Sequence, residues 1–266
     1  MKCLKPVPLR VWNKKGELVE MMVPCGKCIA CRVNRTQEWS MRMMHESCFH
    51  DYNFFVTLTY SPEHLPQDFG LHKSDFQLWL KRLRKHLDYK IKYFACGEYG
   101  EQFGRPHYHA IIFGLMPDDV PLLSTCWQLG FVKVGTCTEY STQYVSGYIQ
   151  KKLIGKRAVE YGDREPPFQL VSQGLGYAYA SANKEFYEQK GVSRYRGHVK
   201  AIPRYYKKKL DLDLTEVYLS SVPKLLEGGE CVLDEAGQVI PVCDLRDREQ
   251  RERNLLAKMN LHRRKI

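Results

Sequence analysis

Long hydrophobic runs are missing from this sequence. The longest apolar stretch, Ala110 to Met116, has seven residues even when Gly114 is counted, whereas a membrane-spanning helix needs about 20. The first residues, Met1 to Trp12, are interrupted by Pro6 and Pro8 and contain no continuous apolar segment of the kind found in signal peptides. We therefore expect a protein that has no membrane partner and works in the cytoplasm.

Acidic residues are the minority among the charges, and no internal repeat is visible. The chain has 41 Lys and Arg against 30 Asp and Glu, a formal net charge of +11. A polyanion such as nucleic acid is therefore the natural partner, although a merely soluble basic protein has the same balance. The 266 residues, 44% hydrophobic and 27% charged, exclude wholesale disorder and suffice for one large domain with appendages.

Strand and helix patterns alternate between about residues 53 and 153. Apolar and β-branched runs predict strands at residues 54–60, 90–98, 107–115 and 131–136, and helical spacing predicts helices at 74–87, 121–129 and 142–153. Ser74 and Gln77 form a capping-box pattern at the start of the first of these helices. The order resembles the split ferredoxin-like arrangement. It predicts an α/β (α+β) fold on a central antiparallel sheet with flanking helices.

The sequence His107-Tyr-His109 opens the third expected strand. Residues i and i+2 of a strand point to the same face, so both imidazoles project together as half of a metal site. The alternative is one buried and one solvated histidine. A hard divalent ion also needs a carboxylate, and we prefer Glu98 to the alternative, Glu101. Hydrolases of the His-x-His-x-Asp-His type are disfavoured because apolar residues follow His109.

A second candidate site is the segment from Tyr144 to Lys152. Helical spacing places Tyr144, Tyr148, Lys151 and Lys152 along one stripe. A packing stripe is the alternative, but such a stripe does not normally end in two lysines. A phenol is a weak nucleophile because its pKa is near 10, yet it can attack a phosphodiester that a metal ion polarises.

Three motifs in this order resemble those of a known family. They are Phe55-Val-Thr-Leu-Thr-Tyr60, Gly104-Arg-Pro-His-Tyr-His109, and the Tyr144 to Lys152 stripe. The sequence is similar to the HUH rolling-circle replication-initiation proteins of microviruses, especially the gokushovirus branch. The similarity covers residues 53–152, and Val23-Pro-Cys-Gly-Lys-Cys28 also resembles that branch.

The resemblance implies a chemistry and a setting. His107, His109 and a carboxylate would hold Mg²⁺ or Mn²⁺ against a scissile phosphate. Tyr144 or Tyr148 would form a 5′-phosphotyrosine and release a 3′-hydroxyl that primes rolling-circle synthesis, and Lys151 or Lys152 would stabilise developing charge. The implied partners are single-stranded or negatively supercoiled viral origin DNA and the host's replication helicase and polymerase. The implied location is the cytoplasm of a bacterial host.

Cysteines are plentiful and partly clustered. Cys25, Cys28 and Cys31 have the spacing of metal ligands, and an iron–sulfur cluster is disfavoured because no further cysteine follows at the required position. The pattern predicts a structural Zn²⁺ with Cys3 as the fourth ligand, and Cys48 and His45 are the alternatives. Three cysteines spaced so by chance would also give this pattern.

A stretch without acids follows near the C-terminus. Residues 190–209 contain eight Lys or Arg and no Asp or Glu, interleaved with tyrosines. Cations pair with phosphates and tyrosine rings stack on unpaired bases, although a solvated basic loop would look the same. The DNA-binding candidates are Arg194, Arg196, Lys200, Arg204, Lys207 and Lys208.

These patterns predict three segments. Residues 1–50 would form a zinc-knuckle arm with a helix, residues 51–155 an HUH catalytic domain, and residues 156–266 a basic DNA-binding extension packed on that domain. A plasmid initiator or an HUH transposase would share the chemistry. From another class, a non-catalytic nucleic-acid-binding protein with an RRM-like sheet and a zinc knuckle would share the architecture, with its tyrosines and histidines serving in packing.

Overall fold

The computed structural model describes most of the chain. Described are residues 3–12, 16, 18–100, 103–151, 159, 161–195, 197–212, 214, 231–233, 239–241, 250 and 252–257. The chain divides into two compact units, one formed by Thr36–Asn183 and the other by Met1–Arg35 together with Lys184–Ile266. The division into segments at residues 50 and 155 stays a prediction.

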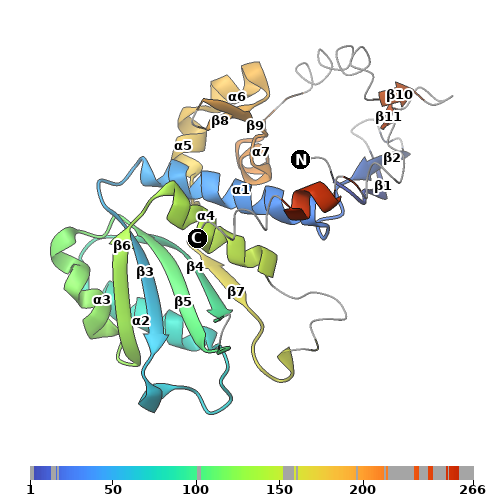
Figure 1. Cartoon of the computed structure of the whole chain (residues 1–266). Coiled ribbons are helices and arrows are strands. Elements are labelled where there is room, and N and C mark those ends of the chain that lie inside the picture. The colour runs from blue at the N-terminus through green and yellow to red at the C-terminus, as the bar shows by residue number, and fades with distance from the viewer. Residues whose placement is uncertain are drawn as a thin grey trace. The chain divides into compact units, whose positions relative to one another are not determined.

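The unit Thr36–Asn183 is built on one antiparallel sheet of five strands (Figure 1). The strand order is β6-β3-β5-β4-β7. The strands are β3 (Asn53–Tyr60), β4 (Lys92–Tyr99), β5 (Pro106–Phe113), β6 (Gly130–Thr136) and β7 (Phe168–Val171). The helices are residues 36–47 of α1 (Ile29–Ser47), α2 (Lys73–His86), α3 (Val120–Cys126), α4 (Glu139–Lys151) and α5 (Tyr177–Ala182), with short 3-10 turns at η1 (Pro62–His64) and η2 (Pro117–Asp119).

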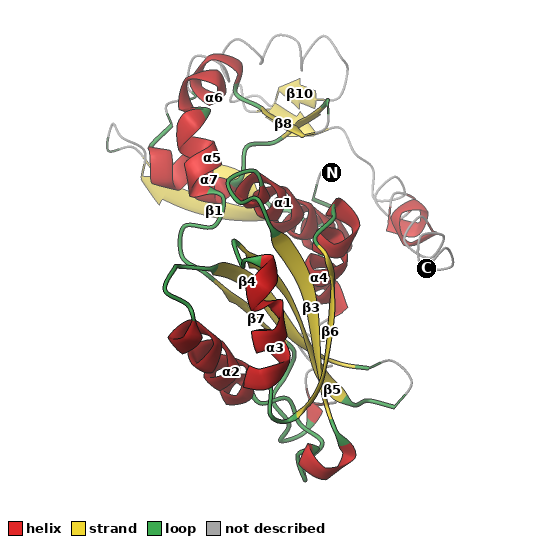
Figure 2. Ribbon diagram, turned by 90° about the vertical axis from the view of Figure 1, so that its left-hand side faces the viewer, coloured by secondary structure: helices red, strands yellow, loops and turns green. Residues whose placement is uncertain are grey.

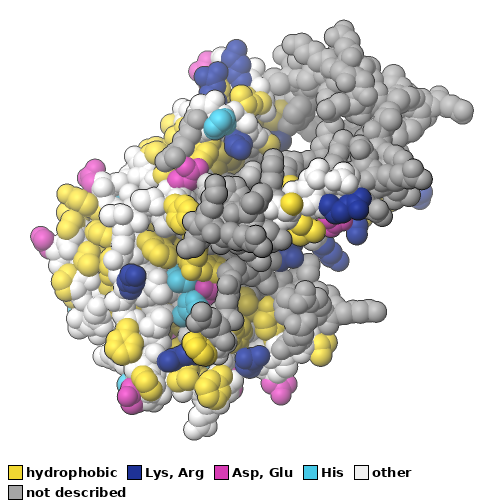
Figure 3. Space-filling view, viewed as in Figure 1, with side chains coloured by type: hydrophobic (Ala, Val, Ile, Leu, Met, Phe, Trp, Pro, Cys, Tyr) yellow, Lys and Arg dark blue, Asp and Glu magenta, His cyan; other side chains and the backbone are white. Residues whose placement is uncertain are grey.

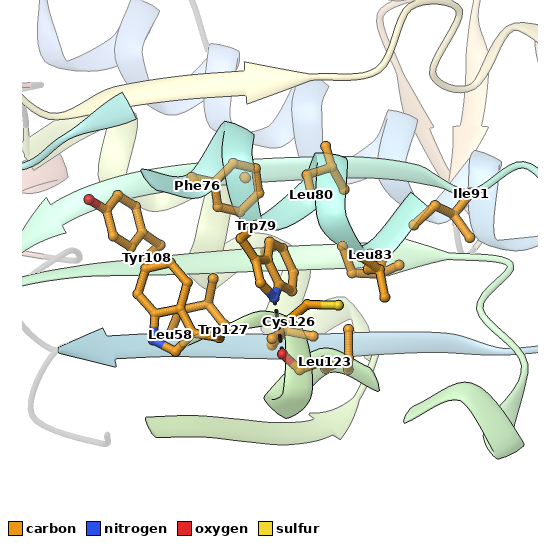
Figure 4. Close-up of a cluster of buried hydrophobic side chains, with 14 of the residues drawn as sticks. Leu58, Phe76, Trp79, Leu80, Leu83, Ile91, Tyr108, Leu123, Cys126 and Trp127 are labelled. Carbon is orange, nitrogen blue, oxygen red and sulfur yellow. Dashed lines mark hydrogen bonds between the residues drawn. The ribbon is translucent and has the colours of Figure 1, made fainter. Parts of the chain in front are cut away.

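Helices α2 and α3 cover one face of the sheet (Figure 2). Every second residue of the strands points to this side, so Leu58 and Tyr108 join Phe76 and Trp79 of α2 in a buried core (Figure 4). The indole N–H of Trp79 donates a hydrogen bond of 3.0 Å to the carbonyl of Leu123 in α3. This bond satisfies the polar group of the buried indole and links the two helices above the sheet.

Helix α4 and the second half of α1 lie on the opposite face. Met43 of α1, Val145 of α4, and Phe94 and Ile111 of the sheet are fully buried together. Towards one end of β4 and β5 the residues on this face become polar. The apolar core therefore ends at a cluster of ionisable side chains.

The expected fold class and element order are confirmed for this unit. The sequence β3, α2, β4, β5, α3, β6, α4 follows the predicted order. The capping box is wrong, because α2 begins at Lys73 and its first turn is capped by the carboxylate of Glu165, which accepts the Lys73 backbone N–H at 2.9 Å. Strand β7 was not expected, and it extends the sheet by pairing with β4.

The other unit contains short elements. They are β1 (Val7–Trp12), β2 (Leu18–Val23), the start of α1, α6 (Lys184–Lys190), β8 (Ser193–Tyr195), β9 (His198–Lys200), α7 (Arg204–Leu210), β10 (Cys231–Leu233) and β11 (Val239–Pro241). The strands form two-stranded antiparallel pairs, β1-β2, β8-β9 and β10-β11. Tyr187 and Tyr206 are buried, with ring centroids 6.3 Å apart. Within the described residues, no helix has both the length and the apolar character to cross a membrane.

Candidate metal centre and tyrosine pair

Glu98, His107 and His109 meet on the sheet face that α4 covers. Glu98 of β4 lies directly opposite His107 of β5 in the strand register. Its Oε1 atom is 2.7 Å from Nε2 of His107 and 3.1 Å from Nε2 of His109. The candidate ligand atoms of all three residues lie within 4.8 Å of one another. Two imidazoles and one carboxylate in this arrangement could hold a divalent metal ion.

The outer nitrogen of each imidazole is engaged elsewhere. Nδ1 of His107 lies 3.1 Å from the carbonyl oxygen of Arg105, and Nδ1 of His109 lies 3.0 Å from Oγ1 of Thr57 on β3. Such contacts hold metal-binding histidines in one ring orientation and favour the tautomer whose other nitrogen is free to bind. Both Nε2 atoms therefore face Glu98, as a shared metal site requires.

The turn between β4 and β5 supports His107. The carbonyl of Arg105 also accepts the backbone N–H of Gly100 at 2.9 Å. Gly104 in this turn has φ of +63°, a left-handed conformation that glycine adopts without steric cost. The glycine therefore lets the chain return at the point where Arg105 can bind the histidine. The alternative ligand Glu101 is in this turn but outside the described residues.

The electrostatics of the centre favour an ionised carboxylate. Glu98 is 7% exposed and His109 is 5% exposed. Burial by itself works to raise the pKa of Glu98, but the hydrogen bonds and charges of His107 and His109 outweigh it and hold the pKa below its ordinary value. The centre thus keeps a negative charge for a cation.

Tyr144 and Tyr148 lie beside this cluster on one face of α4. The ring of Tyr148 stacks on His109, with centroids 5.3 Å apart and an interplanar angle of 4°. The ring of Tyr144 meets the same imidazole edge-on at 5.2 Å and lies 4.9 Å from the ring of Tyr148. The spacing predicted from the sequence therefore brings both phenols to the same histidine.

The two tyrosines differ in exposure. Tyr144 is 37% exposed, whereas Tyr148 is 4% exposed. Burial, with contributions from Tyr144 and from the charge of Glu98, raises the pKa of Tyr148 far above its ordinary value. Lys151 ends α4, but its side chain and all of Lys152 lie outside the described residues. The phenols, and not the lysines, are the groups that the structure brings to the centre.

Cys3, Cys25, Cys28 and Cys31 form a second group that could hold a metal ion. The Cys3 Sγ atom lies 3.6 Å from that of Cys25 and 3.7 Å from that of Cys28. A tetrahedron with metal–sulfur bonds of about 2.3 Å has edges of about 3.8 Å, so these separations suit zinc geometry. The alternative ligands Cys48 and His45 are not members of the group.

The backbone supports the Cys group. The N–H of Cys25 donates to Sγ of Cys3, and the N–H of Cys28 donates to Sγ of Cys25, both at 3.3 Å. Burial alone would raise the pKa of the Cys28 thiol, but hydrogen bonds from the backbone of Cys31 and Leu4 outweigh it and lower the pKa to about 6. Thiolate is the form that binds metal.

The predicted DNA-binding residues are distributed over β8, β9 and α7. Arg194 is exposed on β8, and its guanidinium lies 5.3 Å from the ring centroid of Phe186. Lys200 lies on β9, and α7 carries Arg204, Lys207 and Lys208. Arg196 lies outside the described residues. These side chains share one compact unit, and their role in binding DNA stays a prediction.

Thr57 is a site residue that the sequence reasoning missed. Its signal was present, because Thr57 and Thr59 alternate with buried Leu58 and so share the face of the imidazoles. Which threonine reaches a histidine depends on the β3–β5 register, which sets Thr57 opposite His109. Fold and site together define a mixed α/β protein whose antiparallel sheet carries a candidate metal centre next to two tyrosines.

Comparison with known proteins identifies the family. The family model that matches residues 53–153 is that of the replication-associated protein ORF2. The chain is 31% identical to replication-associated protein ORF2 of Spiroplasma virus 4, over 85% of this chain and 86% of that protein. It is 32% identical to replication-associated protein VP4 of Bdellovibrio phage phiMH2K, over 77% of this chain and 76% of the relative.

A third relative is replication-associated protein ORF4 of Chlamydia phage 1, which is 30% identical over 70% of this chain and 52% of the relative. The chain belongs to the family of phage replication-associated proteins. The relationship to microvirus replication proteins that the three motifs indicated is confirmed at the level of the family.

Proposed function

We propose that this protein initiates phage DNA replication by nicking one strand at the viral origin and rejoining it, as an HUH endonuclease and strand transferase. The observation that carries the proposal is the contact of both tyrosine rings with His109, whose Nε2 lies 3.1 Å from the Glu98 carboxylate. A nucleophile pair beside a candidate cation site is what cleavage of a phosphodiester through a protein-linked intermediate needs. Family membership favours a phage protein over a plasmid initiator or a transposase.

The residues of the centre fit a hard divalent cation. Glu98, His107 and His109 would hold it, and bound Mg²⁺ or Mn²⁺ would supply Lewis-acid polarisation of the scissile phosphate. The contacts from Thr57 and Arg105 keep the two imidazoles oriented. The packing of α4 on the sheet keeps the phenols next to the phosphate that the centre would bind.

The chemical step uses a tyrosine of α4. The phenol oxygen of Tyr144 or Tyr148 attacks the phosphorus, the bond from phosphorus to the 3′ oxygen breaks, and the phenol proton is lost to water. The products are a 5′-phosphotyrosine and a strand that takes up a proton and ends in a 3′-hydroxyl, which primes synthesis. Attack by that hydroxyl, or by a later one, reverses the step without ATP. Two tyrosines permit a second cleavage while the first still holds a 5′ end.

The remaining assignments belong to the same proposal. The four cysteines would bind a structural Zn²⁺ in a zinc knuckle, and the basic residues of β8, β9 and α7 would contact the strand. Lys151 or Lys152 would stabilise the charge that develops at the phosphate. The protein would act in the cytoplasm of the bacterial host on single-stranded or negatively supercoiled origin DNA, with the host's helicase and polymerase.

A nicking assay on the viral single-stranded circle tests the proposal. With Mn²⁺ present, the purified protein should linearise the circle and remain attached to its 5′ end, which a denaturing gel before and after proteinase treatment detects. His107→Ala and His109→Ala should abolish nicking while retaining DNA binding. Nicking at the wild-type rate in both variants would refute the metal centre, and an inactive wild-type protein that binds DNA would favour the non-catalytic alternative.

A further inference from the structure

A row of side chains leads across the sheet to the candidate metal centre. The β6–β3 register sets Phe131 opposite Thr59, and the β3–β5 register sets Thr59 opposite His107. The next row contains Lys133, Thr57 and His109 in the same order. Residues directly opposite each other in antiparallel strands share a face of the sheet. Phe131 and Lys133 therefore project from the face that carries the imidazoles.

The burial pattern of β6 supports this orientation. Val132 and Val134 pack against the core under α2 and α3, so the residues between them point to the other side. On that side Phe131 is 65% exposed and Lys133 is also exposed. Lys133 forms no ion pair with any described residue. Helix α4 packs on β4 and β5, and the strands β3 and β6 extend beyond it.

Figure 3 shows the surface of this face. Histidine and acidic side chains meet there, and the adjoining surface consists largely of polar and backbone atoms with hydrophobic and basic side chains among them. We call Phe131, Lys133, Thr57 and Thr59 the β6 strip. Its composition is an aromatic ring, a cation and two hydroxyls, arranged in line with the centre.

We propose that the β6 strip binds the single strand next to the scissile phosphate, with a base stacked on Phe131 and a phosphate paired with Lys133. An unpaired base has a free face to stack on a ring, and a cation tracks the backbone. Neighbouring strands are about 4.8 Å apart, so Phe131 lies two strand spacings, roughly 10 Å, from His107. At a rise of about 3.4 Å per stacked nucleotide, the stacked base is about three nucleotides from the nick.

The chemistry of the strip favours single-stranded DNA over other polyanions. Duplex DNA presents a backbone whose bases are already stacked, so it would use Lys133 but not the ring. An acidic peptide would likewise use the charge alone. The substitutions at the two positions therefore separate these ligands. The proposal rests on the proposed function for the position of the nick, but the strip can be tested without any cleavage.

Binding of a fluorescein-labelled 20-mer of thymidine in EDTA is the first test. Phe131→Ala should weaken binding about fivefold or more, and Phe131→Tyr should restore it, because stacking needs the ring. Lys133→Ala should lower the slope of log Kd against log salt by about 0.7, the value for one phosphate contact on a single strand. The same 20-mer annealed to its complement should be insensitive to Phe131→Ala.

Matched controls come from outside the strip. Phe49, which is 51% exposed, lies before the opposite end of β3, and Lys85 is exposed on α2. Phe49→Ala and Lys85→Ala should leave affinity and salt slope as in the wild type. Equal losses for Phe49→Ala and Phe131→Ala, or wild-type affinity in both strip variants, would overturn the proposal.

Photocrosslinking locates the base directly. Thymidine 20-mers with one 5-iododeoxyuridine should crosslink to the peptide that contains Phe131, as peptide mass mapping detects, and the yield should fall in Phe131→Ala. Crosslinks confined to other peptides would refute the β6 strip even in a protein that nicks DNA. Conversely, crosslinking at Phe131 in a protein that never nicks would support the strip and refute the proposed chemistry.

Discussion

The ring of Tyr148 lies parallel to the imidazole of His109, with an interplanar angle of 4° and centroids 5.3 Å apart. The second tyrosine of the helix, Tyr144, meets that imidazole edge-on and is far more exposed. The two phenols are thus not equivalent. Stacking and burial hold Tyr148 in place, whereas Tyr144 has access to a strand arriving from solvent.

This asymmetry predicts different effects of the two phenylalanine variants. Tyr144→Phe should slow the first cleavage of an origin oligonucleotide more than Tyr148→Phe does, because burial raises the pKa of Tyr148. Each single variant should retain some cleavage but fail to release closed circles, and the double variant should form no adduct. Peptide mass mapping of the trapped phosphotyrosine is the measurement. An adduct on Tyr60 or Tyr108 would contradict the assignment.

Removal of the Thr57 hydroxyl should weaken metal binding without loss of the fold. Thr57→Val takes away the partner 3.0 Å from Nδ1 of His109, and loss of such a partner typically costs about 10-fold or more in metal affinity. Calorimetric titration with Mn²⁺ measures the change. Thr59→Val is the matched control, since Thr59 lies on the same strand face but opposite His107. Equal affinities in the two variants would argue against a positioning role for Thr57.

The cysteine group predicts about one zinc per chain. Cys28→Ser should lose the metal and lower the melting temperature, because metal binding is coupled to folding. Cys48→Ser is the control, as this exposed cysteine is not a member of the group. Elemental analysis of protein purified under reducing conditions gives the answer. Iron in place of zinc, or full zinc content in Cys28→Ser, would remove the assignment.

The basic residues of α7 predict a strong dependence of DNA binding on salt. Replacing Arg204, Lys207 and Lys208 by Ala should weaken binding to single-stranded DNA. It should also reduce the slope of log Kd against log salt by about 0.7 for each phosphate that the variant no longer binds. Fluorescence anisotropy at several salt concentrations measures this slope. An unchanged slope would show that these residues form an ordinary solvated surface.

Glu46 predicts a pH-dependent stability. Its side chain is 1% exposed, 2.8 Å from Lys92 Nζ and 2.9 Å from His50 Nε2, and it accepts the backbone N–H of Gly176 at 2.6 Å. Burial works to raise the pKa of Glu46, but the interactions with Lys92, Gly176 and His50 outweigh it and lower the pKa. The stabilisation is therefore present above the unfolded pKa of about 4.3 and is lost as the pH falls through the lower, folded value.

At neutral pH, Glu46→Gln should reduce the free energy of unfolding by about 2 kcal/mol, the scale of hydrogen bonds to a charged group. Urea unfolding of the variant and the wild type at pH 7 and below pH 4 measures the difference, which should shrink in acid. Glu63→Gln is the control, because Glu63 is exposed on the turn η1. A difference that grows in acid would reverse the assigned sign.

Periodicity within one element is what the sequence determined by itself. The alternation in His107-Tyr-His109 predicts two imidazoles on one face, and the four-residue spacing of Tyr144 and Tyr148 predicts two phenols on one side of a helix. Both follow from backbone geometry that every strand or helix shares. The structure has both arrangements, and it brings the phenols to the imidazole of His109.

Partners from other elements were decided only by the tertiary structure. The sequence left Glu98 and Glu101 open, and the β4–β5 register sets Glu98 opposite His107. The helix α2 carries a local capping pattern, yet Glu165 caps it from far along the chain. Strand register and helix packing depend on how whole hydrophobic faces fit together, so a short sequence window does not encode which side chains meet across them.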